Sequence, residues 1–198
     1  MTSELEILDR TRLAAGFLKV DRFTLRHRLH AGGMSAPLSR EVLRRGPAAA
    51  VLLYDPAHDA VTLVEQFRIG PHIAGLPAWV LEVVAGLVEP GESPIDVARR
   101  EAREEAGAEI SAIAPLLRFT ASPGCSDETI DLFIARVDST ALSGIHGLAD
   151  EGEDIRVVVM PRAEAYAACG DGRIANAITL VAIQWLELNR DRLPALWS

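Results

Sequence analysis

Three glutamates near the middle of the chain, Glu101, Glu104 and Glu105, have a spacing that could support metal-dependent chemistry. On a helix, side chains three and four residues apart project side by side. Three carboxylates in one patch repel each other unless a cation lies between them. Hard divalent cations such as Mg²⁺ take oxygen ligands and often bridge to substrate phosphates. We therefore predict that these glutamates form a metal platform for phosphate chemistry.

The surrounding residues predict the helix that must position these glutamates. Ser93 suits the N-cap, Pro94 suits the first helical position, and Gly107 can end the helix in a left-handed conformation. Small or aliphatic residues recur at helical spacing and predict a stripe that packs against a sheet. This stripe consists of Ile95, Ala98, Ala102 and Ala106. We expect the acidic patch to lie beside the stripe and to face a cleft.

The spacing of the whole segment is more specific than its acidity. An isolated Arg-Glu-x-x-Glu-Glu run is most often a solvated helix face. Here, however, the segment resembles the Nudix box at every fixed position, which favours the functional interpretation. Those positions are Gly86, Glu92, Arg100, Glu101, Glu104, Glu105 and Gly107. One neighbouring position departs from the pattern, because Ala108 stands where the family usually has a larger residue.

Length and composition limit the class of protein. The chain has 198 residues, enough for one domain plus an extension, and 49% of them are hydrophobic. A net charge of −8 argues against a nucleic-acid partner or an anionic membrane. No apolar segment is long enough to span a membrane, and the N-terminus has no signal-peptide pattern, so we predict a cytoplasmic protein.

The two cysteines, Cys125 and Cys169, are far apart and lack the spacing of a metal site. We interpret both as reduced thiols, which is typical of cytosolic proteins. Cys125 is expected in a loop and Cys169 in helix packing.

The first forty or so residues predict strands. Phe17, Phe23, Leu25 and Leu29 are interleaved with charged residues in a rough period of two, and residues 40–43 predict another strand. We therefore predict an N-terminal β subdomain over residues 1–44 that mediates dimerisation, followed by a hydrolase domain over residues 45–198.

The rest of the chain predicts strands and helices in a mixed order. Strands are expected at 48–54, 61–67, 79–84, near 116–120, 129–137 and 155–160, and helices at about 162–169 and 176–189. The last helix is expected to pack through Ile178, Val181, Ala182, Trp185 and Leu188. The predicted fold class is α/β, an α/β/α sandwich of the Nudix type with a mixed sheet, plus the N-terminal antiparallel β subdomain.

Two further segments resemble the bacterial ADP-ribose pyrophosphatase branch of the Nudix family. Pro123 lies sixteen residues after Gly107, an offset that resembles a hallmark of that branch. Residues 147–156 resemble its catalytic loop. This resemblance implies that Glu151 is the general base and Glu153 an additional metal ligand. Glu104 and Glu105 remain the alternative bases, because the base varies in location across the wider family.

The same resemblance implies which residues bind the substrate. The arginine matching Arg68 contacts the diphosphate, and the one matching Arg40 reaches the ligand from the other subunit of a dimer. Arginine suits diphosphate because its planar fork binds two oxygens at once. The aromatic residue matching Phe17 stacks near the adenine, and Glu128 is also predicted to bind substrate.

The resemblance also implies a metal set of two or three Mg²⁺ ions per site, with Mn²⁺ able to substitute. Glu101 and Glu105 are the best candidate ligands, followed by Glu104, Glu153 and the carbonyl of Ala85. Arg100, counted among the catalytic residues, is expected to form a salt bridge with Glu92 that joins loop and helix.

The implied activity is Mg²⁺-dependent hydrolysis of ADP-ribose to AMP and ribose 5-phosphate. One alternative is a Nudix hydrolase of another nucleoside diphosphate sugar, such as GDP-mannose. Another is a regulator that binds ADP-ribose without cleaving it, although such proteins typically lose carboxylates of the box. The expected partners are a small-molecule substrate and a second copy of the chain, with no nucleic acid and no membrane.

Overall fold

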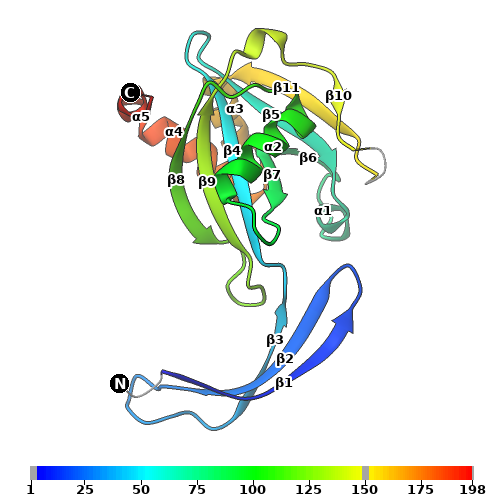
Figure 1. Ribbon diagram of the computed structural model, residues 1–198, viewed down its shortest axis with the longest axis vertical. Helices are drawn as coiled ribbons and strands as arrows, with labels where there is room; N and C mark the ends of the chain where they lie inside the picture. Colours follow the sequence, from blue (N-terminus) through cyan, green and yellow to red (C-terminus); the bar gives the residue numbers. More distant parts are fainter. Residues whose placement is uncertain (1–3, 149–151, 198) are drawn as a thin grey trace. The chain divides into compact units, whose positions relative to one another are not determined.

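The structure of the protein is a computed structural model that describes residues 4–148 and 152–197. The chain forms two compact units (Figure 1). The N-terminal unit consists of residues 1–47 together with residues 120–129, and the main unit consists of residues 48–119 and 130–198. None of the helices in the described ranges is long and apolar enough to cross a membrane.

The main unit is built on one large sheet. In the described residues its strand order is β10-β11-β5-β4-β9-β8, while β6 pairs with β5 and β7 pairs with β4. The strands are β4 (Pro47–Asp55), β5 (Ala60–Phe67), β6 (Trp79–Glu82), β7 (Val84–Leu87), β8 (Ala112–Thr120), β9 (Thr129–Arg136), β10 (Ile145–His146) and β11 (Ile155–Pro161). The helices are α1 (Ile69–Ile73), α2 (Pro94–Ala106), α3 (Arg162–Asp171), α4 (Ala177–Leu188) and α5 (Leu193–Leu196), with short 3₁₀ segments η1 (Ser139–Ala141) and η3 (Arg190–Arg192).

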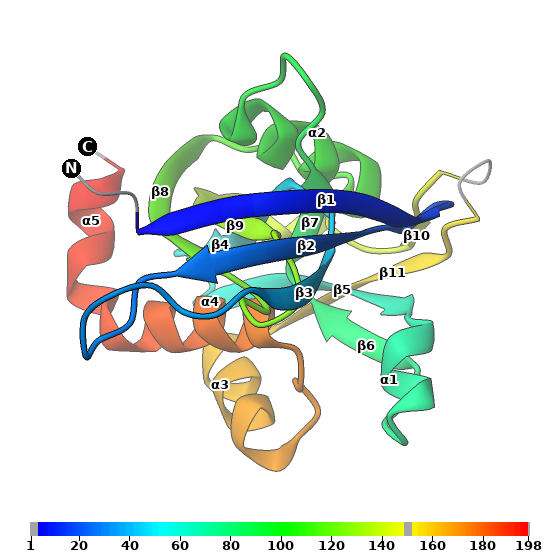
Figure 2. The ribbon, with the colours of Figure 1, turned by 90° about the horizontal axis from the view of Figure 1, so that it is seen from below.

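Strand β4 forms the centre of this sheet. Its residues 48–55 are all buried, as expected for a continuous apolar run covered on both faces. Helix α2 packs on one side of the sheet, and α3 and α4 pack on the other (Figure 2). The core under α2 includes Val51, Val64, Val97, Ala102 and Phe133. The predicted α/β sandwich with a separate N-terminal sheet is therefore confirmed.

Helix α2 begins and ends where the sequence predicted. The Ser93 hydroxyl accepts the N–H of Asp96 at 3.3 Å, which satisfies one of the free donors of the first turn. Gly107 adopts a left-handed conformation with φ of 61°, and its N–H donates to the carbonyl of Arg103 at 3.0 Å. These two caps define which turn of the helix carries each glutamate.

The buried face of α2 differs from the prediction in one respect. Ala98, Ala102 and Ala106 are buried as predicted, and Ile95 is half-buried. Glu105 is also buried, because it lies seven residues after Ala98 and so shares the face that packs on the sheet. The acidic residues therefore do not all lie beside the apolar stripe.

We expect Gly107→Ala to destabilise the protein by about 1–2 kcal/mol, because an L-residue is strained in the left-handed region. A Cβ at this position would also lie 2.9 Å from Cε1 of His146. Chemical denaturation of Gly107→Ala alone and together with His146→Ala separates the two causes. If Gly107→Ala matches the wild type in stability, the assigned role of the left-handed cap is wrong.

The buried face of α4 corrects the prediction. The buried residues are Thr179, Ala182, Ile183 and Leu186, whereas Leu188 is 83% exposed. The helix is apolar nearly all round, so periodicity alone could not select the inner face. A polar contact marks that face, because the buried Thr179 hydroxyl accepts the N–H of Val83 at 2.9 Å.

Other boundaries also differ from the prediction. The strand expected at 79–84 is divided into β6 and β7, because the N–H of Val83 donates to Thr179. Strand β8 begins at Ala112, four residues earlier than expected. The short elements α1, β10 and α5 were not predicted.

The N-terminal unit contains a three-stranded antiparallel sheet in the order β1 (Leu5–Ala15), β2 (Lys19–His27), β3 (Leu38–Leu43). Phe23 and Leu25 lie in β2 as expected. Phe17, however, lies in the connection between β1 and β2 and is 91% exposed, and Leu29 lies beyond the end of β2. The period-two pattern was therefore wrong at its two ends.

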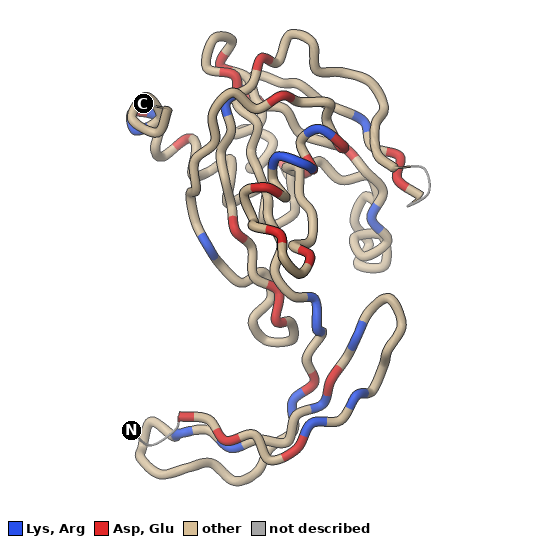
Figure 3. Tube along the Cα trace, viewed as in Figure 1, with Lys and Arg blue, Asp and Glu red and all other residues tan. Residues whose placement is uncertain are grey.

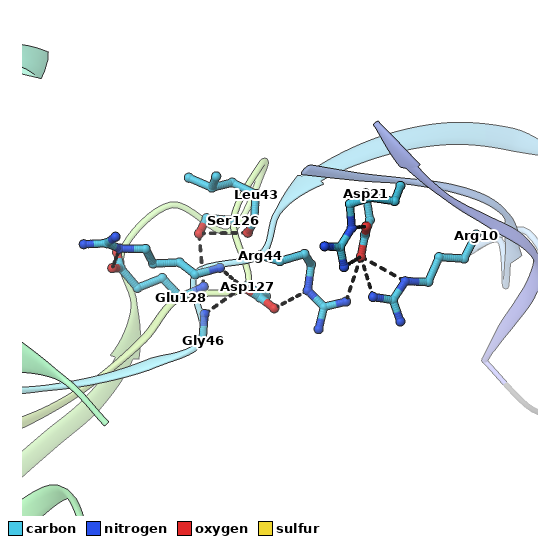
Figure 4. A network of polar contacts seen from close by, with 10 residues as sticks. Arg10, Asp21, Leu43, Arg44, Gly46, Ser126, Asp127 and Glu128 are labelled. Carbon is cyan, nitrogen blue, oxygen red and sulfur yellow. Dashed lines mark hydrogen bonds and ion pairs between the residues drawn. The ribbon is translucent and has the colours of Figure 1, made fainter. Parts of the chain in front are cut away.

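Residues 120–129 join the N-terminal unit through a polar network (Figure 4). The Asp127 carboxylate accepts the N–H of Arg45 at 2.7 Å, the N–H of Gly46 at 3.1 Å and the guanidinium of Arg44 at 2.5 Å. The predicted division after residue 44 does not include this second segment in the N-terminal part. As a division into functional domains it stays a prediction.

The same network continues to a buried carboxylate. Asp21 is fully buried, and it accepts hydrogen bonds from the guanidinium groups of Arg12 and Arg10, with Arg44 at 3.5 Å. The hydrogen bond from Arg12 keeps the pKa of Asp21 below its ordinary value, although burial acts in the opposite direction. Asp21 thus links β1, β2 and the segment after β3.

Candidate active site

Arg100 holds the acidic residues of α2 and the preceding loop together. Its Nη1 donates to Oε1 of Glu101 at 2.8 Å and to Oε2 of Glu104 at 3.0 Å. Its Nε donates to Oε1 of Glu92 at 3.3 Å, so the predicted salt bridge between these two residues is confirmed. Basic and acidic positions are interspersed along α2 (Figure 3). Arg100 therefore supplies the positive charge that allows Glu101 and Glu104 to lie close together.

Glu105 occupies a different environment from its neighbours. Only 3% of its surface is exposed, and its Oε2 accepts the N–H of Ala85 at 3.2 Å. The pKa of Glu105 is raised to about 8, mainly by burial and also by the charges of Glu101 and Glu153, while the hydrogen bond from Ala85 acts in the opposite direction. Glu105 thus connects α2 to strand β7 at a high electrostatic cost.

Glu101 lies directly against the backbone of β7. A Cβ added to Gly86 would lie 1.8 Å from Oε1 of Glu101 and 2.3 Å from its Cδ. The sequence predicts that Gly86, a fixed position of the box, lets the chain turn closely under the site. In the structure, the glycine leaves the space that the Glu101 carboxylate occupies. Burial raises the pKa of Glu101, while the charge of Arg100 acts in the opposite direction.

Glu153 lies near these carboxylates, although it is distant in sequence. Its charge contributes to the raised pKa values of Glu101 and Glu105. Its own Oε2 accepts the N–H of Leu148 at 3.0 Å, and the N–H of Gly147 donates to the carbonyl of Glu104 at 3.3 Å. The base of this segment is thus attached to the C-terminal end of α2. Glu151, the predicted general base, lies outside the described residues.

The donor set fits a hard divalent cation in its chemistry. Glu105 is a buried carboxylate beside the like charge of Glu101, and a cation would offset both the burial and the repulsion. In the described residues the side chains do not form a group of three or more acidic, His or Cys ligands that could hold a metal ion. The guanidinium of Arg100 lies between Glu101 and Glu104 instead. The metal assignments for these residues, Glu153 and the Ala85 carbonyl therefore stay predictions.

Arg68 lies on the same side of the sheet as α2. It directly follows β5, and its positive charge lowers the pKa of Glu105. Its Nε donates to Oε2 of Glu82 at 2.9 Å. The structure thus brings together Arg68, Ala85, Glu101, Glu104, Glu105 and Glu153 in the main unit.

The remaining predicted residues lie in the N-terminal unit. The guanidinium of Arg45 lies 5.8 Å from the centre of the Phe17 ring, and its Nε lies 3.5 Å from Oε1 of Glu128. Arg40 lies on β3, where its Nη1 donates to the carbonyl of Ser39 at 2.8 Å. Phe17 and Glu128 are therefore joined through Arg45, whereas no contact among the described residues joins Arg40 to either of them.

Sequence reasoning missed two residues that the structure places beside predicted site residues. Glu82 contacts Arg68, and Arg45 contacts both Phe17 and Glu128. The sequence could have indicated Glu82 as a candidate site residue, because it is the one acidic residue in the apolar run from Trp79 to Val84. Nothing in the sequence indicated the role of Arg45, because its partners Phe17 and Glu128 are distant in sequence.

Comparison with known proteins identifies the chain's relatives. The NUDIX domain family matches residues 44–180. The chain is 46% identical to the ADP-ribose pyrophosphatase of Escherichia coli strain K12, over 99% of this chain and 94% of that protein. It is also 46% identical to the ADP-ribose pyrophosphatase of Haemophilus influenzae, over 98% of this chain and 91% of that protein.

More distant relatives include the GDP-mannose pyrophosphatase of Yersinia enterocolitica, which is 32% identical over 96% of this chain and 98% of that protein. A solved structure, the crystal structure of an ADP compounds hydrolase, has the same fold with a TM-score of 0.72 and 21% identity, covering 96% of both chains. The match to the family, together with the carboxylates and glycine that the main unit assembles around α2 and β7, shows that the chain belongs to the Nudix family.

Proposed function

We propose that this protein hydrolyses the diphosphate bond of ADP-ribose and releases AMP and ribose 5-phosphate. The observation that carries the proposal is 46% identity, over nearly the whole chain, to proteins named ADP-ribose pyrophosphatase. It is supported by the intact carboxylates of α2, which a protein that only binds the nucleotide would not need.

Each side chain has a definite part in the proposed reaction. Two or three Mg²⁺ ions, with Mn²⁺ as a substitute, would neutralise the phosphate oxygens and orient the attacking water. Glu101 and Glu105 would hold the ions, with Glu104, Glu153 and the carbonyl of Ala85 as further ligands. Arg68 would bind the diphosphate, since its side chain is about half exposed and its charge acts on Glu105.

We further propose Glu151 as the general base, with Glu104 and Glu105 of α2 as its rivals. Replacement of the true base by glutamine is expected to lower kcat by about 10²-fold, because positioned proton transfer typically contributes at least that factor. It should also remove the acidic limb of the pH profile of kcat. We would measure both for Glu151→Gln and Glu104→Gln. An acidic limb that survives only in Glu104→Gln supports Glu151, and the reverse pattern assigns the base to Glu104.

Recognition of the nucleoside is proposed to involve Phe17, Arg40 and Glu128, with Arg40 acting on the site of a second copy. Every residue of β1 is exposed, and its side chains include Ile7, Leu8 and Leu13, so a second copy would cover apolar surface. The homodimer is tested by the mass of the protein in solution and by the KM of Arg40→Ala. A monomer whose KM is unaffected by this substitution would rule out the role across subunits.

The activity is tested with purified protein, Mg²⁺ and a panel of ADP-ribose, GDP-mannose and NADH in H₂¹⁸O, with products analysed by mass spectrometry. We expect preferential formation of AMP and ribose 5-phosphate, and the position of the label identifies the attacked phosphorus. Removal of divalent cations with EDTA should abolish turnover, and Mn²⁺ should restore part of it. Hydrolysis of none of the three compounds would contradict the proposal.

A second candidate substrate is GDP-mannose, because a relative named for it is 32% identical over 96% of this chain. If the protein prefers GDP-mannose in the panel, the proposed active site stands but the substrate is GDP-mannose rather than ADP-ribose. Tight binding of ADP-ribose without turnover would instead support a regulator. The cytoplasmic location and the lack of a nucleic-acid partner remain proposals that rest on the amino-acid sequence.

A further inference from the structure

The contact between Arg68 and Glu82 leaves one edge of the arginine available. Nε of Arg68 donates to Oε2 of Glu82 at 2.9 Å. In the part of the chain that the structure describes, neither Nη1 nor Nη2 of Arg68 makes a hydrogen bond, whereas Nε does. A guanidinium can bind two oxygens at once through its two terminal nitrogen atoms. Glu82 thus occupies the Nε position and leaves the end that can bind a diphosphate.

Strand register places Glu82 on the side of the sheet that faces α2. Glu82 pairs with Val64, and paired residues of neighbouring strands point to the same face. Val64 belongs to the core that packs under α2. Arg68 lies four residues after Val64, and its charge lowers the pKa of Glu105. The arginine and its acidic partner are therefore on the side of the sheet that carries the predicted metal ligands.

The environment of Glu82 is suited to holding a side chain in place. Glu82 is the last residue of β6, three residues before Ala85 on β7, whose N–H is bound by Glu105. Its side chain is 19% exposed, whereas that of Arg68 is 45% exposed. The carboxylate is thus held within the sheet while the arginine extends from it. Without this partner, an exposed arginine side chain would have to lose its rotational freedom when substrate binds. The hydrogen bond to Glu82 restricts the side chain before binding.

From these contacts we infer that Glu82 is a positioning residue, which holds Arg68 by its Nε so that the two terminal nitrogen atoms face the diphosphate of the substrate. Glu82 itself does not contact the substrate. The inference rests on the proposed function, because it requires that Arg68 bind a diphosphate. It goes beyond that function by assigning the orientation of Arg68 to a residue outside the Nudix box.

The experiment measures KM and kcat for ADP-ribose with Mg²⁺ for Glu82→Ala, Arg68→Ala, the double variant and Glu82→Gln. We expect Glu82→Ala to raise KM about tenfold with kcat changed less than about threefold, since one charge-assisted hydrogen bond is lost. The Arg68→Ala variant should have a higher KM, and adding Glu82→Ala to it should change KM no further. Glu82→Gln keeps an acceptor oxygen for Nε and should restore most of the affinity.

Glu65→Ala is the matched control. Glu65 lies on β5 next to Val64 and so points to the opposite face of the sheet. Its Oε2 accepts Nη2 of Arg156 at 2.7 Å, and the pair is about as exposed as Arg68 and Glu82. Loss of this pair should leave KM and kcat unchanged. Thermal unfolding of every variant shows whether a change in KM accompanies a loss of fold.

The outcomes separate this inference from the proposed function. If the wild type hydrolyses no nucleoside diphosphate compound, the proposed function itself is wrong. If the wild type is active and Glu82→Ala keeps the wild-type KM, Glu82 does not position Arg68. The inference is also overturned if Glu82→Ala raises KM equally in the Arg68→Ala background, because Glu82 would then act independently of Arg68.

Discussion

Replacing Glu105 by glutamine is expected to lower kcat/KM by about 10³-fold or more while making the protein free of metal more stable at neutral pH. Activity falls because a bound metal contributes several kcal/mol of charge stabilisation in the transition state, and each 1.36 kcal/mol is a factor of ten. Stability rises because the amide keeps an oxygen for the N–H of Ala85 and never ionises, whereas the carboxyl must either take up a proton on folding or be buried as a charge next to Glu101.

The pH dependence gives this prediction its sign. The pKa of Glu105 rises from its ordinary 4.5 to about 8 in the folded protein. A group with a raised pKa contributes stability that is fully present below pH 4.5 and is lost as the pH rises to about 8. In EDTA, the melting temperature of the wild type should therefore fall across this range relative to that of Glu105→Gln.

Thermal unfolding at several pH values, with EDTA or with Mg²⁺, measures both effects. Mg²⁺ should raise the melting temperature of the wild type more than that of Glu105→Gln, since binding to the folded state stabilises it. Glu109→Gln is the control, because Glu109 has an exposed side chain near the end of the same helix. Glu105→Gln with wild-type activity, or with an unchanged pH dependence, would contradict the role assigned to this carboxylate.

Gly86→Ala is expected to lower kcat/KM by about 10³-fold with little change in stability. The added Cβ would lie 1.8 Å from Oε1 of Glu101, so the carboxylate must move away from β7. A shift of about 1 Å in a catalytic group can cost 10²-fold, and loss of a metal ligand adds to this. All the atoms that the methyl group would meet belong to the Glu101 side chain, which can rotate away. The fold can therefore accommodate the methyl group, but the carboxylate loses its position in the site.

Gly170→Ala is the matched control for this substitution. It adds the same methyl group in α3, where a Cβ would have no heavy atom within 4 Å. Steady-state kinetics and thermal unfolding of both variants distinguish a displaced ligand from a damaged fold. An active Gly86→Ala variant would show that Glu101 does not need its place against β7. A variant that fails to fold would show that the glycine supports the sheet rather than the site.

The sequence predicted α2 and its surroundings well because local physics determines them. Ser93 and Gly107 are capping residues, and caps act within one turn of the helix. The apolar run in β4 is long enough to indicate a strand covered on both faces. The Nudix spacing located the charged residues on α2, and the contact between Arg100 and Glu92 followed from it.

Other features depend on tertiary contacts that periodicity cannot supply. Helix α4 is apolar on several faces, and its inner face is marked by the hydrogen bond from Val83 to Thr179. Glu105 is charged, so hydropathy placed it outside the apolar stripe, although its spacing from Ala98 places it on the buried face. Glu82 and Arg45 gained their positions from partners on other strands or loops.

The discontinuous N-terminal unit has a consequence for how this protein could be recombined with its relatives. A chimera that exchanged only residues 1–47 would separate Arg44 and Arg45 from Asp127 and Glu128, their partners in the segment 120–129. It would also place Phe17 and Arg45 in a different parental sequence from Glu128, to which Arg45 connects Phe17. A functional chimera must therefore exchange residues 1–47 and residues 120–129 together. This requires one crossover near residue 47 and two more on either side of residues 120–129.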